Sequence, residues 1–322
     1  MTSTRDSFQR GISYLRISVT DRCNLRCIYC MPPEGVPLVT HDEILTFEEI
    51  LLVVRAAVGL GINKVRITGG EPLVRAGIID LVRMIAELPG VKDISMTTNG
   101  LLLEQYAEEL VAAGLQRINI SLDTLKYERF KEITRSGDLA NALKGIKAAK
   151  EAGLNPVKIN MVPMVGVNDD EIVDFARMTL EPGWHVRFIE LMPASRKVDF
   201  VASHVLRKKI ETLGPLQPYY GLAGNGAARY FTLPDARGTV GFISAVSEPF
   251  CKDCNRLRLS STGVVYPCLF SASGVDVRTP IRSGADVEAA AHLLKAAIAA
   301  KPSGHHLDEG KRMNKNMSSI GG

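Results

Sequence analysis

The sequence has 322 residues, of which 46% are hydrophobic and 23% are charged, with a mean hydropathy of +0.06. This composition is that of a globular protein and excludes a disordered, collagen-like or coiled-coil chain. The 39 Lys and Arg residues exceed the 35 Asp and Glu residues by four, so the net charge is +4. A weakly basic chain suits an anionic small ligand and, without a concentrated patch, does not predict nucleic-acid binding.

From residue 13 to about residue 192, β-rich runs alternate with helical patterns. The predicted strands are Tyr14–Thr20, Lys64–Thr68, Asp93–Thr98, Arg117–Leu122, Val157–Pro163 and His185–Glu190. The predicted helices between them are Phe47–Leu60, Gly77–Leu88, Leu102–Ala113, Ala140–Ala152 and Asp169–Leu180. Thr46 followed by Glu49 predicts a capping box at the start of the first helix. Six β/α repeats predict a parallel sheet, either an incomplete barrel or a doubly wound sheet, with ligands at the C-terminal ends of the strands.

The pattern changes beyond about residue 195. Turn residues over 214–227 precede short β-like runs at Arg229–Leu233 and Gly238–Ala245, and a helical pattern covers Asp286–Ala299. We predict a domain boundary here, with residues 1–195 forming the barrel and residues 196–322 a smaller C-terminal layer packed against it.

The N-terminal residues lack the apolar core of a secretory signal, and no run approaches the roughly 18 consecutive apolar residues of a membrane span. We therefore predict a cytoplasmic protein without membrane contact. In that compartment disulfides are rare, and clustered cysteines more often hold metal.

All six cysteines fall into two groups of three. The first group, Cys23, Cys27 and Cys30, has the spacing C-x3-C-x2-C and follows the first predicted strand. Three thiolates leave one iron of a four-iron cube without a protein ligand, and an open iron can bind a substrate. A zinc site is the alternative, but structural zinc prefers four protein ligands and no fourth is nearby.

The second group consists of Cys251, Cys254 and the returning Cys268. It again supplies three thiolates, so we predict a second cluster with an open iron, and we expect the substrate to be its ligand. The alternative is a zinc site that stabilises the small domain. Arg256 and Arg258 follow Cys254 and share one face of a predicted strand, where their guanidinium groups offer planar donors to a phosphate or a carbonyl oxygen.

The sequence has no P-loop motif, so a nucleoside triphosphate would depend on cations that project inward from the strands. Buried cations are costly unless a ligand or partner matches them, although any one of them can be purely structural. The candidates are Arg16, Lys64, Arg66, Lys158 and Arg187.

The segment TDRCNLRCIYC, with Tyr29 before its last cysteine, and the turn Gly69–Pro72 resemble the signature of radical S-adenosylmethionine enzymes. The resemblance implies an incomplete (β/α)6 TIM-like barrel whose first [4Fe–4S] cluster binds S-adenosylmethionine and cleaves it to a 5′-deoxyadenosyl radical. It also implies the cofactor-binding residues Tyr29, Gly70, Ser121 and Met192.

The segments CNRLRLS and PCLF, together with the terminal Gly321 and Gly322, narrow this resemblance to the GTP 3′,8-cyclases of molybdenum cofactor biosynthesis. It implies that a second [4Fe–4S] cluster holds guanine and that the Gly-Gly tail inserts toward the active site. The implied GTP-binding residues are Arg16, Arg66, Thr97, Lys158, Arg256 and Arg258, of which Arg16, Arg256 and Arg258 are expected to act on the reacting substrate.

The resemblance further implies a reducing electron donor and transfer of the product to cyclic pyranopterin monophosphate synthase, and a homodimer is possible. Two other functions stay open at this point. One is a different radical enzyme with an auxiliary cluster, such as a peptide maturase. The other is a zinc-stabilised binding module without catalysis.

Overall fold

The structure, a computed structural model, describes residues 4–192, 199–222, 226–307 and 320. The chain divides into two compact units. Unit 1 comprises residues 1–97, 109–116 and 251–322, and unit 2 comprises residues 98–108 and 117–250. Both ends of the sequence therefore belong to the same unit.

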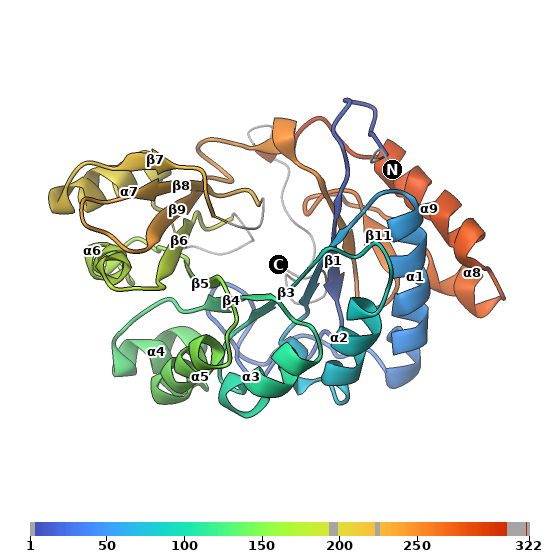
Figure 1. Cartoon of the computed structure of the whole chain (residues 1–322), viewed down its shortest axis with the longest axis horizontal. Helices are drawn as coiled ribbons and strands as arrows, with labels where there is room; N and C mark the ends of the chain where they lie inside the picture. Colours follow the sequence, from blue (N-terminus) through green and yellow to red (C-terminus); the bar gives the residue numbers. More distant parts are fainter. Residues whose placement is uncertain (1–3, 193–198, 223–225, 308–319, 321–322) are drawn as a thin grey trace. The chain divides into compact units, whose positions relative to one another are not determined.

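Unit 1 contains strands in the order β12, β11, β10, β1, β2, β3. The four strands from β10 to β3 are parallel, and the two beyond β10 are antiparallel. Their bounds are β1 Tyr14–Ser18, β2 Lys64–Thr68, β3 Asp93–Thr98, β10 Arg256–Leu259, β11 Val264–Tyr266 and β12 Val275–Asp276. The helices are α1 Phe47–Gly59, α2 Ile78–Ala86, α8 Arg278–Arg282 and α9 Val287–Ala299, with α1 and α9 side by side (Figure 1).

Unit 2 contains strands in the order β4, β5, β6, β9, β8, β7. The first four are parallel, and β8 and β7 are antiparallel. The strand bounds are β4 Arg117–Ser121, β5 Val157–Met161, β6 His185–Ile189, β7 Gln217–Tyr219, β8 Arg229–Thr232 and β9 Thr239–Ile243. Its helices are α4 Tyr127–Thr134, α5 Leu139–Glu151, α6 Ile172–Arg177 and α7 Ser203–Ile210, while the residues of α3, Leu103–Ala112, divide between the units.

The predicted α/β fold with parallel strands is confirmed, and all six predicted strands are present with ends shifted by at most two residues. The capping box at Thr46 is also present, since its hydroxyl accepts from the Glu49 amide and the Glu49 carboxylate accepts from the Thr46 amide. Helices α4 and α7 were not predicted. Most residues of both helices are polar, and the few apolar residues that form their buried faces give no clear periodicity in the sequence.

Strands β9 and β10, from the C-terminal part of the chain, pair with strands of the predicted barrel. β10 pairs with β1 and β9 pairs with β6, so each widens the sheet of its own unit. The reason is visible in β10, where Leu257 and Leu259 are fully buried and continue the apolar face that Leu15 and Ile17 begin on β1.

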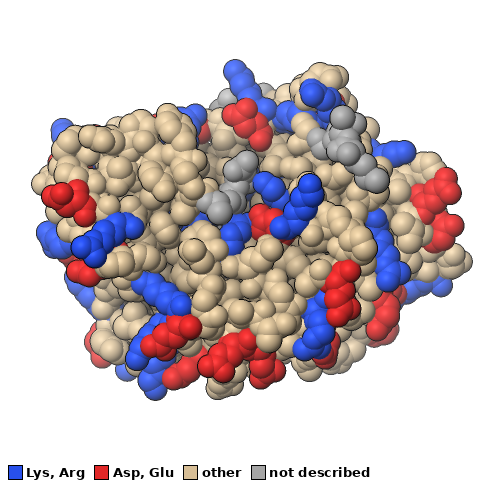
Figure 2. All heavy atoms as spheres, viewed as in Figure 1, with Lys and Arg blue, Asp and Glu red and all other residues tan. Residues whose placement is uncertain are grey.

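No helix among the described residues is both long and apolar enough to cross a membrane. On the molecular face in Figure 2, basic and acidic side chains are interspersed, in keeping with the small net charge.

Candidate active site

The first cysteine group lies on the loop that leaves the C-terminal end of β1, and all three thiols are partly exposed. A turn forms within this loop, because the Cys30 amide donates to the Cys27 carbonyl over 2.9 Å. Burial, with Glu71 and Cys30 nearby, raises the pKa of Cys23 to about 12. A metal centre bound by this loop would supply the positive charge that stabilises the thiolate form of Cys23.

The turn Gly69–Pro72 packs directly against the start of this loop. The Gly70 amide donates to the Thr20 carbonyl and the Glu71 amide to the Arg22 carbonyl, each over 2.8 Å. A Cβ atom on Gly70 would lie 2.2 Å from the Arg22 carbonyl oxygen. The glycine therefore permits a close contact between two backbone segments, in addition to any approach to a ligand.

The second cysteine group is also in unit 1 and is more electropositive. Burial alone raises the pKa of Cys254, but Arg256 and Lys301 outweigh it and bring the value to about 6. Burial raises the pKa of Cys251. At neutral pH at least one thiol of this group is therefore ready to act as a thiolate ligand.

Three arginines face one side of the unit 1 sheet in a single row. Arg258 on β10 is opposite Arg16 on β1, and Arg16 is opposite Arg66 on β2. All three are buried. Burial, followed by the charge of Arg258, brings the pKa of Arg16 well below its usual value, and burial and Arg256 bring the pKa of Arg258 to about 10. This arginine row is a concentration of buried positive charge that an anion would stabilise.

The remaining predicted substrate and cofactor residues of unit 1 lie near this row in the fold. Arg256 is two residues before Arg258 on β10, and Thr97 is on β3, two residues after Ser95, whose hydroxyl accepts from the Arg66 Nε over 3.1 Å. Tyr29 is on the cysteine loop and is partly exposed.

Unit 2 holds Ser121, Lys158 and Met192. Lys158 is opposite Asn119 and His185, and Ser121 is opposite Asn160 in the next row on the same face. Lys158 is 2% exposed, and its Nζ is 5.3 Å from the centre of the Tyr230 ring. Met192 follows β6 and is partly exposed.

Arg187 adds a second buried cation to this face. Its guanidinium donates to the Asn160 and Asn119 side-chain oxygens over 2.8 and 2.6 Å, and Arg187 is 5% exposed. Two neutral amide acceptors leave its charge uncompensated by these contacts, as expected of an anion-binding side chain. Burial, with Lys158 next in importance, lowers the pKa of the neighbouring His185 to about 4, so that the imidazole is neutral at pH 7.

Sequence reasoning missed Glu190, a fully buried carboxylate after β6. It accepts from the amide and hydroxyl of Ser203, from the amide and hydroxyl of Ser247 and from the amide of Val246. These donors outweigh burial and lower its pKa. They also fix the chain two residues before Met192.

Within the described ranges, no three His, Cys, Asp or Glu side chains converge tightly enough to hold one metal ion. A four-iron cube separates its thiolates more widely than a single zinc ion does, because each thiolate binds a different iron.

Comparisons with known proteins agree with these features. The sequence profile of the radical SAM superfamily matches residues 17–179, and that of Molybdenum Cofactor Synthesis C matches residues 184–307. A GTP 3′,8-cyclase of Pelotomaculum thermopropionicum is 52% identical, with 99% of this chain and 100% of that protein covered. The GTP 3′,8-cyclase of Moorella thermoacetica is 49% identical over the same shares of both chains.

The chain belongs to the GTP 3′,8-cyclase family. In fold it is similar to Streptococcus suis SuiB, with a TM-score of 0.57, 18% identity and coverage of 80% of this chain and 60% of SuiB. A second structure of SuiB, bound to S-adenosylmethionine, aligns with the same values. As a member of the radical SAM superfamily, this GTP 3′,8-cyclase family protein takes one [4Fe–4S] cluster and S-adenosylmethionine. The three half-buried thiols of the cysteine loop fit that cluster.

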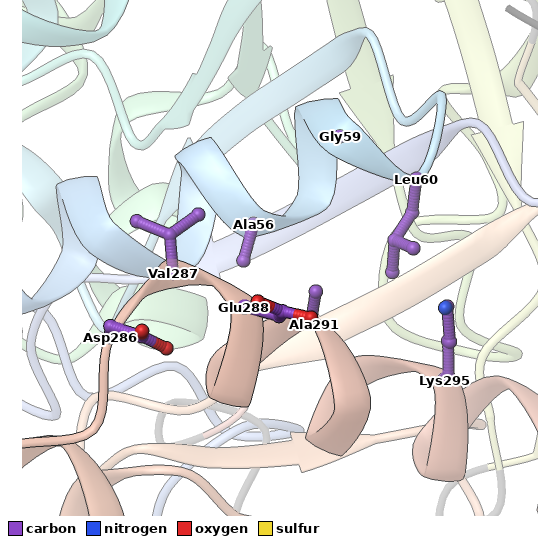
Figure 3. Close-up of a pocket in the computed structure, with 8 residues that line it drawn as sticks. All are labelled: Ala56, Gly59, Leu60, Asp286, Val287, Glu288, Ala291 and Lys295. Carbon is purple, nitrogen blue, oxygen red and sulfur yellow. The ribbon is translucent and has the colours of Figure 1, made fainter.

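A groove between α1 and α9 lies apart from the predicted site residues, none of which lines it. Its walls are Ala56, Gly59, Leu60, Asp286, Val287, Glu288, Ala291 and Lys295 (Figure 3). Its lining has no cysteine, and Lys295 is its one basic residue among those that the structure describes.

Proposed function

We propose that the protein is a GTP 3′,8-cyclase that converts GTP to (8S)-3′,8-cyclo-7,8-dihydroguanosine 5′-triphosphate, an early step in molybdenum cofactor biosynthesis. One observation carries the proposal: the arginine row runs from β2 to β10, the strand that follows Cys254. This arrangement occurs in a chain that is about half identical to proteins of that name along its whole length.

A [4Fe–4S] cluster held by Cys23, Cys27 and Cys30, with S-adenosylmethionine, would supply the 5′-deoxyadenosyl radical for removal of the ribose 3′-hydrogen. The new bond would join the ribose 3′ carbon to guanine C8. The work of the chain is to hold the two reacting carbons together and to exclude other reactions. Arg16, Arg66 and Arg258 would bind the triphosphate from unit 1, because guanidinium groups match phosphate oxygens in charge and geometry.

Lys158 is also proposed to bind the triphosphate, as a buried point charge. The residues proposed to contact S-adenosylmethionine are Tyr29, Gly70, Ser121 and Met192. The fixed chain at Glu190 supports this role for Met192, since a rigid attachment keeps a contact residue in place.

The second cysteine group is proposed to hold a second [4Fe–4S] cluster whose open iron binds guanine. Three thiols with Arg256 and Arg258 on the adjoining strand support this proposal, as does the low pKa of Cys254. Arg16, Arg256 and Arg258 would then act on the substrate as it reacts. The predicted insertion of Gly321 and Gly322 lies outside the described residues.

Two partners are also proposed. The product would pass to cyclic pyranopterin monophosphate synthase, and a reducing protein would supply electrons. A cytoplasmic location and a homodimer remain predictions from the sequence.

The function can be measured with GTP that carries deuterium at C3′. Anaerobically reconstituted protein should form deuterated 5′-deoxyadenosine and the 3′,8-cyclised nucleotide. Unchanged GTP with only unlabelled 5′-deoxyadenosine would contradict the proposal. A peptide maturase would form 5′-deoxyadenosine only with a peptide, and a zinc module would contain zinc instead of iron.

A further inference from the structure

Lys301 lies directly after α9 and is 4% exposed, although a lysine at the end of a helix is usually solvated. Its ammonium group donates to the Arg256 carbonyl over 2.8 Å and to the Pro267 carbonyl over 2.7 Å. Cys254 is near enough for a thiolate there to favour the charged form of the ammonium group. An ammonium group has three protons, and the two carbonyls accept two of them.

The two carbonyls belong to the two arms of the second cysteine group. The Arg256 carbonyl is two residues after Cys254, and the Pro267 carbonyl belongs to the residue before Cys268. One side chain therefore connects the strand that leaves the C-x2-C turn to the segment that returns the third cysteine.

A second cation, Arg10, supports the same region in another way. It donates to the Cys251 carbonyl over 2.8 Å and to the carbonyls of Pro302 and Ser303 over 2.6 and 3.2 Å. Its charge is compensated by Asp6, with an Nε to Oδ2 distance of 2.6 Å. Arg10 thus fixes the chain beside Lys301 and adds no net positive charge.

Lys301 differs from Arg10 in this respect. Among the residues that the structure describes, no carboxylate forms an ion pair with it. Burial lowers the pKa of Lys301, and Cys254 and Cys268 are the negative groups that oppose this shift. A buried ammonium needs a compensating charge, and a thiolate-bound cluster supplies one.

We infer that Lys301 is a positioning residue of the second cluster that sets its reduction potential. The inference rests on the proposed second cluster. A positive charge beside a ligand sulfur stabilises the more negative, reduced state of a cluster, so Lys301 raises the potential. It acts through Cys254 and the two carbonyls and has no assigned contact with GTP.

The experiment uses the full chain with Cys23, Cys27 and Cys30 all replaced by Ala, so that only the second cluster is reconstituted. This background should contain about four irons per chain. Lys301→Met should lower the ratio of reduced to oxidised cluster at least tenfold at a fixed potential, a shift of about 59 mV for a one-electron couple. Lys301→Arg keeps the charge and should stay within threefold of the background. Lys295→Met, an exposed lysine on α9, should leave the ratio unchanged.

The outcomes separate the inference from the function on which it rests. If the background binds zinc or no iron, the second cluster is refuted and the role of Lys301 with it. If Lys301→Met retains four irons and the ratio of reduced to oxidised cluster is unchanged, the role of Lys301 is refuted and the second cluster is not. If Lys301→Met loses its iron, Lys301→Arg decides: a ratio near that of the background supports the inference, and a tenfold fall despite the retained charge overturns it.

Discussion

Gly70 lies so close to the start of the cysteine loop that a Cβ atom on it would be 2.2 Å from the Arg22 carbonyl oxygen and 2.8 Å from that of Asp21. Both obstacles are backbone atoms, which cannot rotate away as a side chain can. Hydrogen bonds from the Gly70 and Glu71 amides to carbonyls of the loop stabilise the same contact. The glycine thus fixes where the loop leaves β1.

Gly70→Ala should destabilise the protein by about 1–3 kcal/mol through overpacking, and it should lower the iron held by the first cysteine group. Gly59→Ala is the matched control, because nothing lies within 4 Å of its added Cβ on α1 (Figure 3). The control should be stabilised by about 0.5–1 kcal/mol. Urea unfolding and iron analysis measure both. Equal stabilities of the two variants would contradict the contact argument.

Glu190 makes a different contribution, because one buried carboxylate accepts from five donors in two segments. Its pKa is lowered in the folded state. Its contribution to stability is therefore complete above the unfolded pKa of about 4.3 and is lost as the pH falls through the folded value.

Glu190→Gln should cost about 2 kcal/mol at pH 7, because an amide offers one acceptor and turns its own donors toward N–H groups. The difference from the native protein should shrink as the pH falls below about 4.3. Urea unfolding at pH 7 and at lower pH measures this. Glu151→Gln, whose pair with Lys147 is exposed, is the control and should change little at either pH. A loss for Glu190→Gln that did not depend on pH would contradict the role of its charge.

At the scale of elements, the pairing of β10, β1 and β2 turns three separate arginines into one row. The register of these parallel strands places residues that point to the same face opposite one another, so the three positive charges lie side by side. The opposite faces of β1 and β10 are apolar and fully buried at Leu15, Leu257 and Leu259. The apolar face thus stabilises the strands, while the other face carries buried positive charge.

Arg16→Met should raise the stability of the ligand-free protein, because it relieves repulsion within the row, and it should weaken GTP binding. In the native protein GTP at about 100 times its Kd should add about 2.7 kcal/mol of stability. Thermal unfolding with and without GTP measures both effects. Arg55→Met, an exposed position on α1, is the control. An undiminished GTP effect in Arg16→Met would contradict a role for the row in binding.

At the scale of the molecule, unit 1 is assembled from both ends of the sequence. β10 and α9 come from the last quarter of the chain, yet they lie beside β1 and α1. The two cysteine groups, more than 200 residues apart in sequence, consequently belong to one compact unit. The domain boundary at residue 195 remains a prediction, which a truncated chain can test.

A chain of residues 1–195 should fail to fold, because β1 and β6 would each lose a parallel neighbour and expose buried backbone at their edges. Soluble expression, circular dichroism and iron content measure the result. The full-length protein is the reference. A soluble truncated chain that binds about four irons would contradict this expectation and support the boundary.

The sequence by itself determined the α/β class, the six strands and the two cysteine groups, because these depend on periodicity and on spacing along a few residues. It also determined the family, through motifs that are local in the chain. Only the tertiary structure decided the partners of β10 and β9, the arginine row, and the burial of Lys301 and Glu190. Lys301 follows a helix like any solvated lysine, and only the return of residues 254–268 beside it supplies its two carbonyl acceptors and the nearby Cys254. Register and burial arise between segments that are distant in sequence, so no local pattern records them.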